Sequence, residues 1–309
     1  MTIEAHTAAP FAGLRFSDSI YERAVRFTSR AALALVLILL ASILFQITRE
    51  ALPALHDALR ISGILGVDWE PLASPPRFGL AAAVTSTLMV SALALALAVP
   101  IGFGIGLFAV EIAPGWLRTV LQPCLELLAG IPSVVYGFFG YVTLVSAFET
   151  YGGMATGESL LIAGLILAVM VLPFTAGVAA ETFDAVPHAL KESAYAMGVT
   201  RVHVIRRIVI PYSLPGLFAA VALGLGRAIG ETLAVLLLAG NSTAMPTSYL
   251  DRGRPLTALM ASELPEAGLG TDQYHALYAA GFVLIVLTVV INLMVWWVKA
   301  KSFGGGARK

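Results

Sequence analysis

The chain has 309 residues, of which 58% are hydrophobic and only 12% are charged. Soluble domains contain about 45–50% apolar and about 25% charged residues, so this composition indicates a membrane protein. The formal net charge of zero favours no nucleic-acid partner, and the single cysteine, Cys124, excludes an intrachain disulfide.

Apolar runs in the sequence predict an all-α protein with six membrane-spanning helices. Residues 1–30 are polar and rich in Arg, and they could hold an interfacial helix with Phe16, Ile20 and Phe27 on one face. Crossing a bilayer takes about 20 apolar residues. The predicted spans are 31–47, 80–110, 121–148, 160–180, 214–239 and 277–298. We expect one transmembrane domain over 31–298, no soluble domain, and a cytoplasmic tail at 299–309.

The basic residues predict which segments face the cytoplasm. Thirteen Lys and Arg side chains lie in the N-terminal segment, the 111–122 turn, the 181–211 loop and the C-terminus. Five lie in the alternate segments, which are 48–79, 148–159 and 240–276. Because Lys and Arg accumulate in cytoplasmic loops, we expect both termini and the 181–211 loop to be cytoplasmic.

The segment 187–211 is the longest charged stretch between two apolar blocks. Pro187 suits the start of a helix, and Gly198 suits its end. A second helix is predicted from Arg201 to Ile210. Helical spacing would place three residues of the first helix on one face: Leu190, Ala194 and Met197. A polar helical hairpin of this kind on a membrane protein predicts a docking partner.

The predicted fifth span contains two charged residues, Arg227 and Glu231, at positions i and i+4. An Arg at the centre of a span costs about 2.5–3.5 kcal/mol on insertion scales. Pairing on one helical face lowers this cost but rarely offsets it. A planar guanidinium suits an oxyanion. We therefore expect a functional charge pair, with a structural ion pair that locks the fifth helix as the alternative.

Pro132 interrupts the predicted third span. The backbone groups that it frees are tolerated inside protein or beside a water-filled cavity. Ser133 could then offer a hydroxyl to a pathway, although a kink that serves packing explains the proline equally well. Pro132 and Pro211 are the predicted structural hinges.

Other chemistry has little support in the sequence. The five histidines are scattered and have no metal-ligand spacing. A P-loop, Gly-x4-Gly-Lys-Ser/Thr, does not occur, so we expect this chain to bind no ATP and no cofactor. Arg206 and Arg207 could meet lipid phosphates or an acidic protein surface.

The segment 187–211 resembles the EAA loop of ABC-importer permeases. Glu192-Ser193-Ala194, Gly198 and Ile208-x-Ile210-Pro211 keep every spacing of that pattern, with Ser193 and Ile210 in place of Ala and Leu. The family seats this loop, as a coupling helix, in a groove of a cytoplasmic ATPase. The resemblance implies that role for five residues: Leu190, Glu192, Ala194, Met197 and Gly198. An ordinary loop with a glycine helix cap is the alternative.

Further motifs resemble the PstC-type permeases of phosphate ABC importers. The first is GRAIGETLAV, which begins at Gly226 and is followed by Gly240-Asn241. The others are AGIPSVVYG at 129–137, Trp69-x-Pro71 with Phe78-Gly79, and Pro255-Leu256-Thr257-x-Leu259 with Glu263. The PstA-type sister subunit usually has Ala-Pro where this chain has Leu233-Ala234.

The resemblance implies the fold, the cargo and the partners. It implies an ABC type I importer permease fold in a bacterial cytoplasmic membrane, with Arg227 and Glu231 taking part in phosphate translocation. The implied partners are a PstA-type permease, two ATPase subunits that bind ATP and Mg, an extracytoplasmic phosphate-binding protein and membrane lipid. Import of molybdate or sulfate, or a membrane role in phosphate signalling, are the alternatives, and a membrane enzyme is less favoured.

Overall fold

The computed structural model describes residues 15–58, 66–153 and 156–303, and it is mainly helical. These residues form two compact units, which meet in sequence between Glu50 and Ala51. The first unit is most of helix α1 (Arg15–Ala58). Its stretch Tyr21–His56 is long and apolar enough to cross a membrane.

The predicted boundary at residue 30 is not a helix end, because α1 runs through it without a break. Residues 1–14 lie outside the described residues, as do the side chains of Phe16 and Ile20. An interfacial position for residues 15–30 stays a prediction.

The second unit contains four more helices that could each cross a membrane: α2 (Ala81–Leu107), α6 (Leu160–Asp184), α9 (Ile210–Gly230) and α12 (Asp272–Phe303). Helices α3 (Gly115–Gly130) and α4 (Ser133–Gly140) are separated by a sharp bend. The described residues therefore give five candidate spans, or six if the bent pair counts as one. This confirms the predicted all-α membrane fold.

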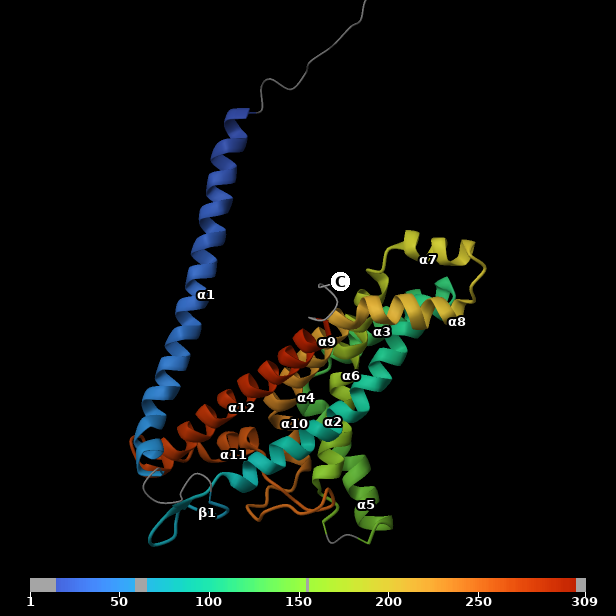
Figure 1. The fold of residues 1–309 in the computed structure, drawn as a ribbon. Helices are drawn as coiled ribbons and strands as arrows, with labels where there is room; N and C mark the ends of the chain where they lie inside the picture. The colour runs from blue at the N-terminus through green and yellow to red at the C-terminus, as the bar shows by residue number, and fades with distance from the viewer. Residues whose placement is uncertain (1–14, 59–65, 154–155, 304–309) are drawn as a thin grey trace, which may run out of the picture. The chain divides into compact units, whose positions relative to one another are not determined.

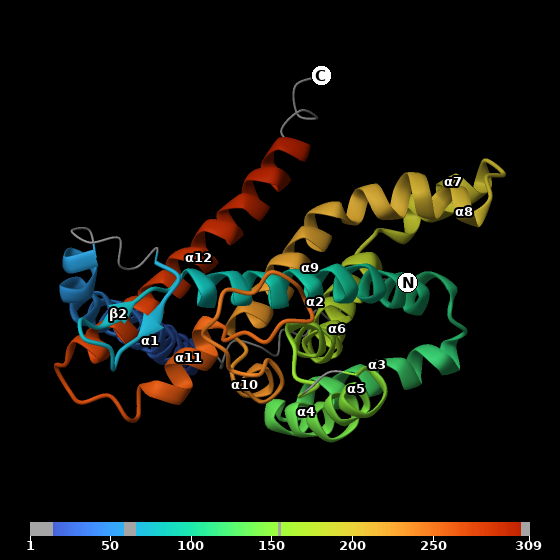
Figure 2. The same ribbon diagram turned by 90° about the horizontal axis from the view of Figure 1, so that it is seen from below.

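Helix α6 is the centre of the second unit. It is apolar on all sides, a pattern typical of a buried helix, and more than half of its most apolar stretch is buried. Small residues let α2 approach it closely, and a Cβ on Gly102 would lie 2.3 Å from Thr175 Oγ1. Figure 2 shows α6 between α2 and the group α3 to α5.

In the described residues, three segments of π-helix adjoin the α-helices: η1 (Phe108–Ile112), η2 (Tyr141–Val145) and η3 (Ile205–Val209). The first follows α2, the second joins α4 to the short helix α5 (Ser146–Tyr151), and the third leads into α9. Such one-turn π segments often occur at functional sites.

The predicted helix over 214–239 is not continuous. Helix α9 ends at Gly230, two extended or irregular residues follow, and the short helix α10 (Leu233–Leu238) then begins. Sequence periodicity missed this break because both sides of it are apolar.

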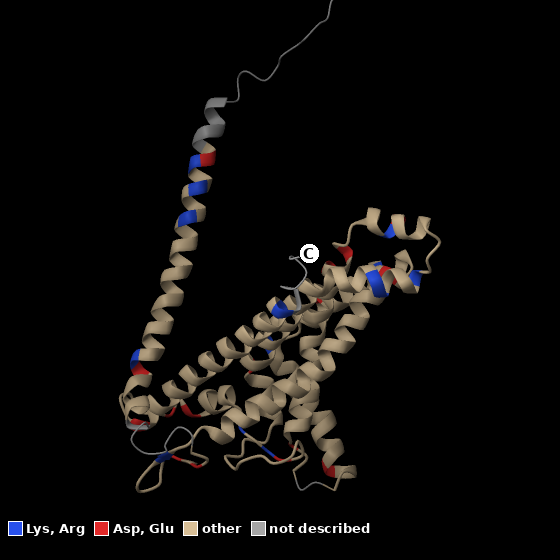
Figure 3. Ribbon diagram, in the orientation of Figure 1, with Lys and Arg blue, Asp and Glu red and all other residues tan. Residues whose placement is uncertain are grey.

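The two ends of the second unit differ in structure. At one end lie α7 (His188–Ala196) and α8 (Arg201–Val204). At the other end lie the antiparallel strands β1 (Trp69–Glu70) and β2 (Arg77–Phe78) and the helix α11 (Leu256–Glu263), as Figure 1 shows. Figure 3 shows that most charged residues of this unit lie at these ends.

Glu263 joins several segments at the second of these ends. Its carboxylate accepts hydrogen bonds from Trp69 Nε1 at 2.9 and 3.0 Å and from Gln273 Nε2 at 3.0 Å. It also pairs with Arg254, which donates to Asn241. One carboxylate thus connects the hairpin β1–β2, α11 and the start of α12.

Candidate functional site

The break between α9 and α10 places Arg227 and Glu231 on different kinds of backbone. Arg227 lies in the last turn of α9, whereas Glu231 has extended angles, with φ −70° and ψ 134°. The Glu231 carbonyl oxygen accepts a hydrogen bond of 2.7 Å from Thr257 Oγ1 in α11. This bond satisfies a buried backbone group that the break frees from the helix.

The Arg227–Glu231 ion pair is a loose one. Arg227 Nη2 lies 3.9 Å from Glu231 Oε2, which is longer than a hydrogen bond. The Glu231 side chain is 6% exposed and that of Arg227 is 36% exposed. In the described part of the chain, the buried Nε of Arg227 has no hydrogen-bond partner. The guanidinium therefore keeps N–H donors for another ligand.

An aromatic ring is the second neighbour of Arg227. The guanidinium carbon lies 4.8 Å from the ring centroid of Phe174 in α6. A cation above a ring face is attracted by the ring quadrupole, and this attraction uses no N–H donor. The ring and the Glu231 carboxylate together position the guanidinium, whose side chain is 36% exposed.

Pro132 and Ser133 lie at the bend between α3 and α4. Pro132 is the residue just before α4, and the two arms of the bend meet at 86°. Tyr136 donates a hydrogen bond of 2.9 Å across the bend to the Leu128 carbonyl. The half-buried Ser133 side chain makes no hydrogen bond to any described residue, so its place in a pathway stays a prediction.

Helix α4 packs directly on α10. A Cβ on Gly137 would lie 2.9 Å from the Ala234 Cα, so only glycine allows this approach. The helix that begins with Ser133 thus lies against the helix that follows Glu231.

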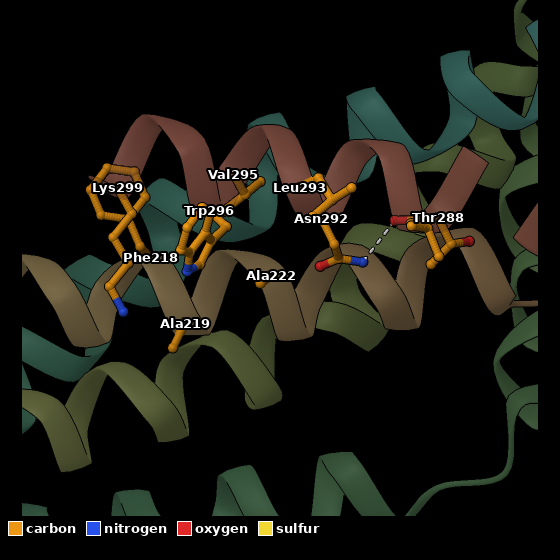
Figure 4. Close-up of a pocket in the computed structure, with 10 residues that line it drawn as sticks. Phe218, Ala219, Ala222, Thr288, Asn292, Leu293, Val295, Trp296 and Lys299 are labelled. Carbon is orange, nitrogen blue, oxygen red and sulfur yellow. Dashed lines mark hydrogen bonds between the residues drawn. The ribbon is translucent and has the colours of Figure 1, made fainter. Parts of the chain in front are cut away.

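A groove of about 480 Å³ lies between α9 and α12. Figure 4 shows its walls, with Ala219 and Ala222 on α9 and Asn292 and Trp296 on α12. Asn292 Nδ2 donates within its own helix to the Thr288 carbonyl. Neither Arg227 nor Glu231 lines this groove, so it is separate from the charge pair.

The hairpin at the other end of the second unit has the predicted turn. Pro187 lies just before α7, and Gly198, with φ +79°, follows that helix. This left-handed conformation is accessible to glycine without strain. The predicted second helix exists as α8 and η3, which run into α9 without a break. Pro211 lies in the first turn of α9.

The predicted common face of Leu190, Ala194 and Met197 is only partly correct. Ala194 is buried against the bundle, whereas Leu190 and Met197 are exposed. Glu192 is exposed as well. The buried positions of α7 are Lys191 and Ala194, because the inner face of this helix turns toward the ends of α2 and α6.

Sequence reasoning missed two contacts. Lys191 forms an ion pair with Glu111 in η1, and both side chains are nearly buried. Phe174 lies beside Arg227. Glu111 had one sequence signal, since it is an isolated carboxylate between apolar neighbours at the end of a predicted span. Nothing in the sequence distinguishes Phe174 from other apolar residues of its helix.

The family model described as binding-protein-dependent transport system inner membrane component matches residues 98–302, about two thirds of the chain. The chain belongs to this family.

Similar proteins of known family support this family assignment. A protein named phosphate transport system permease protein PstC, from Mesorhizobium japonicum, is 37% identical over 283 residues, covering 85% of each chain. A PstC from Haemophilus influenzae is 34% identical over 300 residues, covering 90% of this chain and 93% of its own. A probable ABC transporter permease, YqgH from Bacillus subtilis, is 35% identical over 241 residues, covering 78% of each.

Solved structures support the fold of this inner membrane component. A bacterial alginate ABC transporter aligns with a TM-score of 0.61 and 19% identity, over 91% of this chain and 96% of its own. The MetNI methionine ABC transporter aligns with a TM-score of 0.53 and 18% identity, over 73% and 95%. At these identities the likeness concerns the fold alone.

Proposed function

We propose that the chain is the transmembrane permease subunit of an ATP-driven phosphate importer. The observation that carries this proposal is Arg227, a guanidinium within the helix bundle whose buried Nε has no partner among the described residues. The relatives named PstC support phosphate as the cargo. A phosphate oxyanion matches the planar donor set of Arg.

In the proposed pathway Arg227 attracts the anion and Glu231 limits how long it stays. A conduction site must bind well enough to admit an ion and weakly enough to release it. At 3.9 Å, the Glu231 carboxylate lowers the positive potential at Arg227 without occupying its donors. The Ser133 hydroxyl adds a further polar group at the bend.

The exposed side of α7 is the proposed contact with the ATPase. Leu190, Glu192 and Met197 lie on that side, and Gly198 turns the chain back toward α9. A PstA-type permease would supply the other half of the pathway. Two ATPase subunits would bind ATP and Mg, and an external phosphate-binding protein would deliver the cargo. In this arrangement α7 and both termini face the cytoplasm of a bacterial inner membrane.

Uptake by the reconstituted complex tests the cargo. Vesicles that contain the complex, the binding protein and internal ATP should accumulate radiolabelled phosphate, and vesicles without ATP should not. Excess unlabelled phosphate should abolish the signal, whereas equal concentrations of sulfate or molybdate should leave most of it. Displacement by sulfate or molybdate would show that the cargo is another oxyanion.

A further inference from the structure

The coupling helix α7 has a second attachment to the bundle besides the chain itself. Lys191 points inward from α7 and forms an ion pair with Glu111 in η1, directly after α2. The side chains are 10% and 7% exposed. Figure 1 shows α7 beyond the end of the bundle at which α2 finishes. The pair therefore joins α7 to the end of α2 through η1, by two residues that are 80 positions apart in sequence.

Hydrophobicity alone favours an exposed Glu111 side chain, but this side chain is buried. Its neighbours in the π segment, Phe108 and Ile112, are 39% and 49% exposed, whereas the carboxylate is buried. A π segment adds a residue to a helical turn and so changes which side chains face inward. In η1 the buried side chains are Ala109 and Glu111, whereas the larger Phe108 and Ile112 side chains face outward.

Stability alone gives a weak reason for this pair. Burying two charges costs desolvation energy, and a well-packed apolar pair of similar volume is often as stable or more stable. Apolar packing is available here, since Phe103, Leu107 and Val110 contact the same cluster as Ala194. An ion pair has a further property, which is that it fixes the relative position of two elements.

Helix α2 connects this end of the bundle with the surroundings of Arg227. The Thr175 hydroxyl of α6 lies 3.2 Å from the Ala98 carbonyl of α2 and 3.0 Å from the Leu172 carbonyl of its own helix, and it donates to one acceptor at a time. Thr175 is the neighbour in sequence of Phe174, whose ring faces Arg227. Helix α2 also packs along α6, so a displacement of α2 reaches the aromatic neighbour of the charge through α6.

We propose that Glu111 and Lys191 are positioning residues that make α2 move together with the coupling helix. This inference rests on the proposed function, in which an ATPase displaces α7. The displacement is then delivered along two routes, through α8 and η3 to α9 and through Glu111 to α2. Both helices contact α6, which carries Phe174, so both routes lead to the surroundings of Arg227.

The experiment replaces the ion pair by a covalent link. In a Cys124→Ser background, the double variant Glu111→Cys and Lys191→Cys removes both charges together, so no buried charge is left without a partner. The unlinked variant should assemble with the ATPase normally, but its ratio of phosphate taken up to ATP hydrolysed should fall roughly fivefold or more. A short bis-thiosulfonate linker between the two thiols should restore the ratio.

A second ion pair is the matched control. Arg118 and Asp184 lie 3.0 Å apart between α3 and α6, but their side chains are about half exposed. Arg118→Met should leave the ratio unchanged, because exposed pairs contribute little. A wild-type ratio in the unlinked Cys variant, or no recovery on linking, would overturn the inference. Failure of the proposed function would instead appear in the wild-type complex, as absence of phosphate uptake.

Discussion

Arg227 is held by contacts that leave its charge available. The ion pair to Glu231 is 3.9 Å long, and the contact with Phe174 attracts the cation through a ring face. A guanidinium whose donors were all occupied by carboxylates would offer an anion little. The loose pair and the aromatic neighbour instead fix the position of the group, and its buried Nε has no partner among the described residues.

Arg227→Gln should remove phosphate uptake while the complex still assembles. Hydrogen bonds to a charged group contribute about 1.5–3 kcal/mol, so losing the charge should lower uptake at least about tenfold. Radiolabelled uptake by the reconstituted complex measures this, with co-purification of the ATPase as the assembly control. Arg227→Lys keeps the charge but loses the planar fork and should retain an intermediate rate. Normal uptake by Arg227→Gln would remove Arg227 from the pathway.

At the scale of elements, the apolar runs were sufficient to predict the long helices. Length and composition alone decide whether a helix crosses a membrane, and α2, α6, α9 and α12 lie where runs of apolar residues occur. The bend before α4 was predictable as well, because Pro132 cannot continue a helix in the usual way.

The site itself depended on tertiary contacts that no local pattern reveals. The break at Glu231 is stabilised by Thr257, 26 residues further along. Phe174 comes from a different helix than Arg227, and Lys191 turns inward because Glu111 is there. Helical spacing predicted one common face for Leu190, Ala194 and Met197, but Ala194 is buried against the bundle while the other two are exposed.

Gly198 should be required for the shape of the hairpin that α7 begins. Its φ of +79° is strained for a residue with a branched side chain, although the space beside it is open. Gly198→Val should cost about 1–3 kcal/mol locally and weaken co-purification with the ATPase. Gly198→Asn is the control, because Asn tolerates this conformation. Equal binding by both variants and the wild type would show that the turn is not needed for docking.

The loop between α10 and α11 should lose the hydrogen bonds to its Asp251 carboxylate in acid. Hydrogen bonds from the backbone N–H groups of Thr247 and Ser248 and from the Thr247 hydroxyl lower the pKa of Asp251 below its ordinary value of 3.8. Because the folded-state pKa is lowered, the carboxylate stabilises the loop above pH 3.8, and this is lost as the pH falls through the lower folded-state value.

Amide hydrogen exchange, corrected for the intrinsic effect of pH, measures the hydrogen bonds from the backbone N–H groups of residues 247 and 248. Protection at residues 247 and 248 should be present at neutral pH and decline at low pH in the wild type. Asp251→Asn should have less protection at neutral pH and a flat response to acid. A wild-type loop whose protection does not change between neutral and strongly acidic pH would contradict this assignment.

At the scale of the whole molecule, the distribution of basic residues predicts the orientation. Helix α6 separates the loop after Tyr151 from α7, so these two regions should lie on opposite sides of the membrane. Tyr151 is 88% exposed, and Ala196 in α7 is exposed too. In a Cys124→Ser background, Ala196→Cys should react with an impermeant maleimide only in inside-out vesicles, and Tyr151→Cys only in right-side-out vesicles. The reverse pattern would place α7 outside the cell.

The hydrogen bonds from Trp69, Arg254 and Gln273 to Glu263 have a consequence for the order of synthesis. Trp69 leaves the ribosome 194 residues before the carboxylate that accepts its indole N–H, and Gln273 follows ten residues later still. The hairpin β1–β2 can pack against Leu80 and Ala83 early, but its bond to Glu263 forms only after α2, α6 and α9 have been synthesised. A chain that stops before residue 263 would therefore leave the Trp69 indole N–H without its carboxylate acceptor.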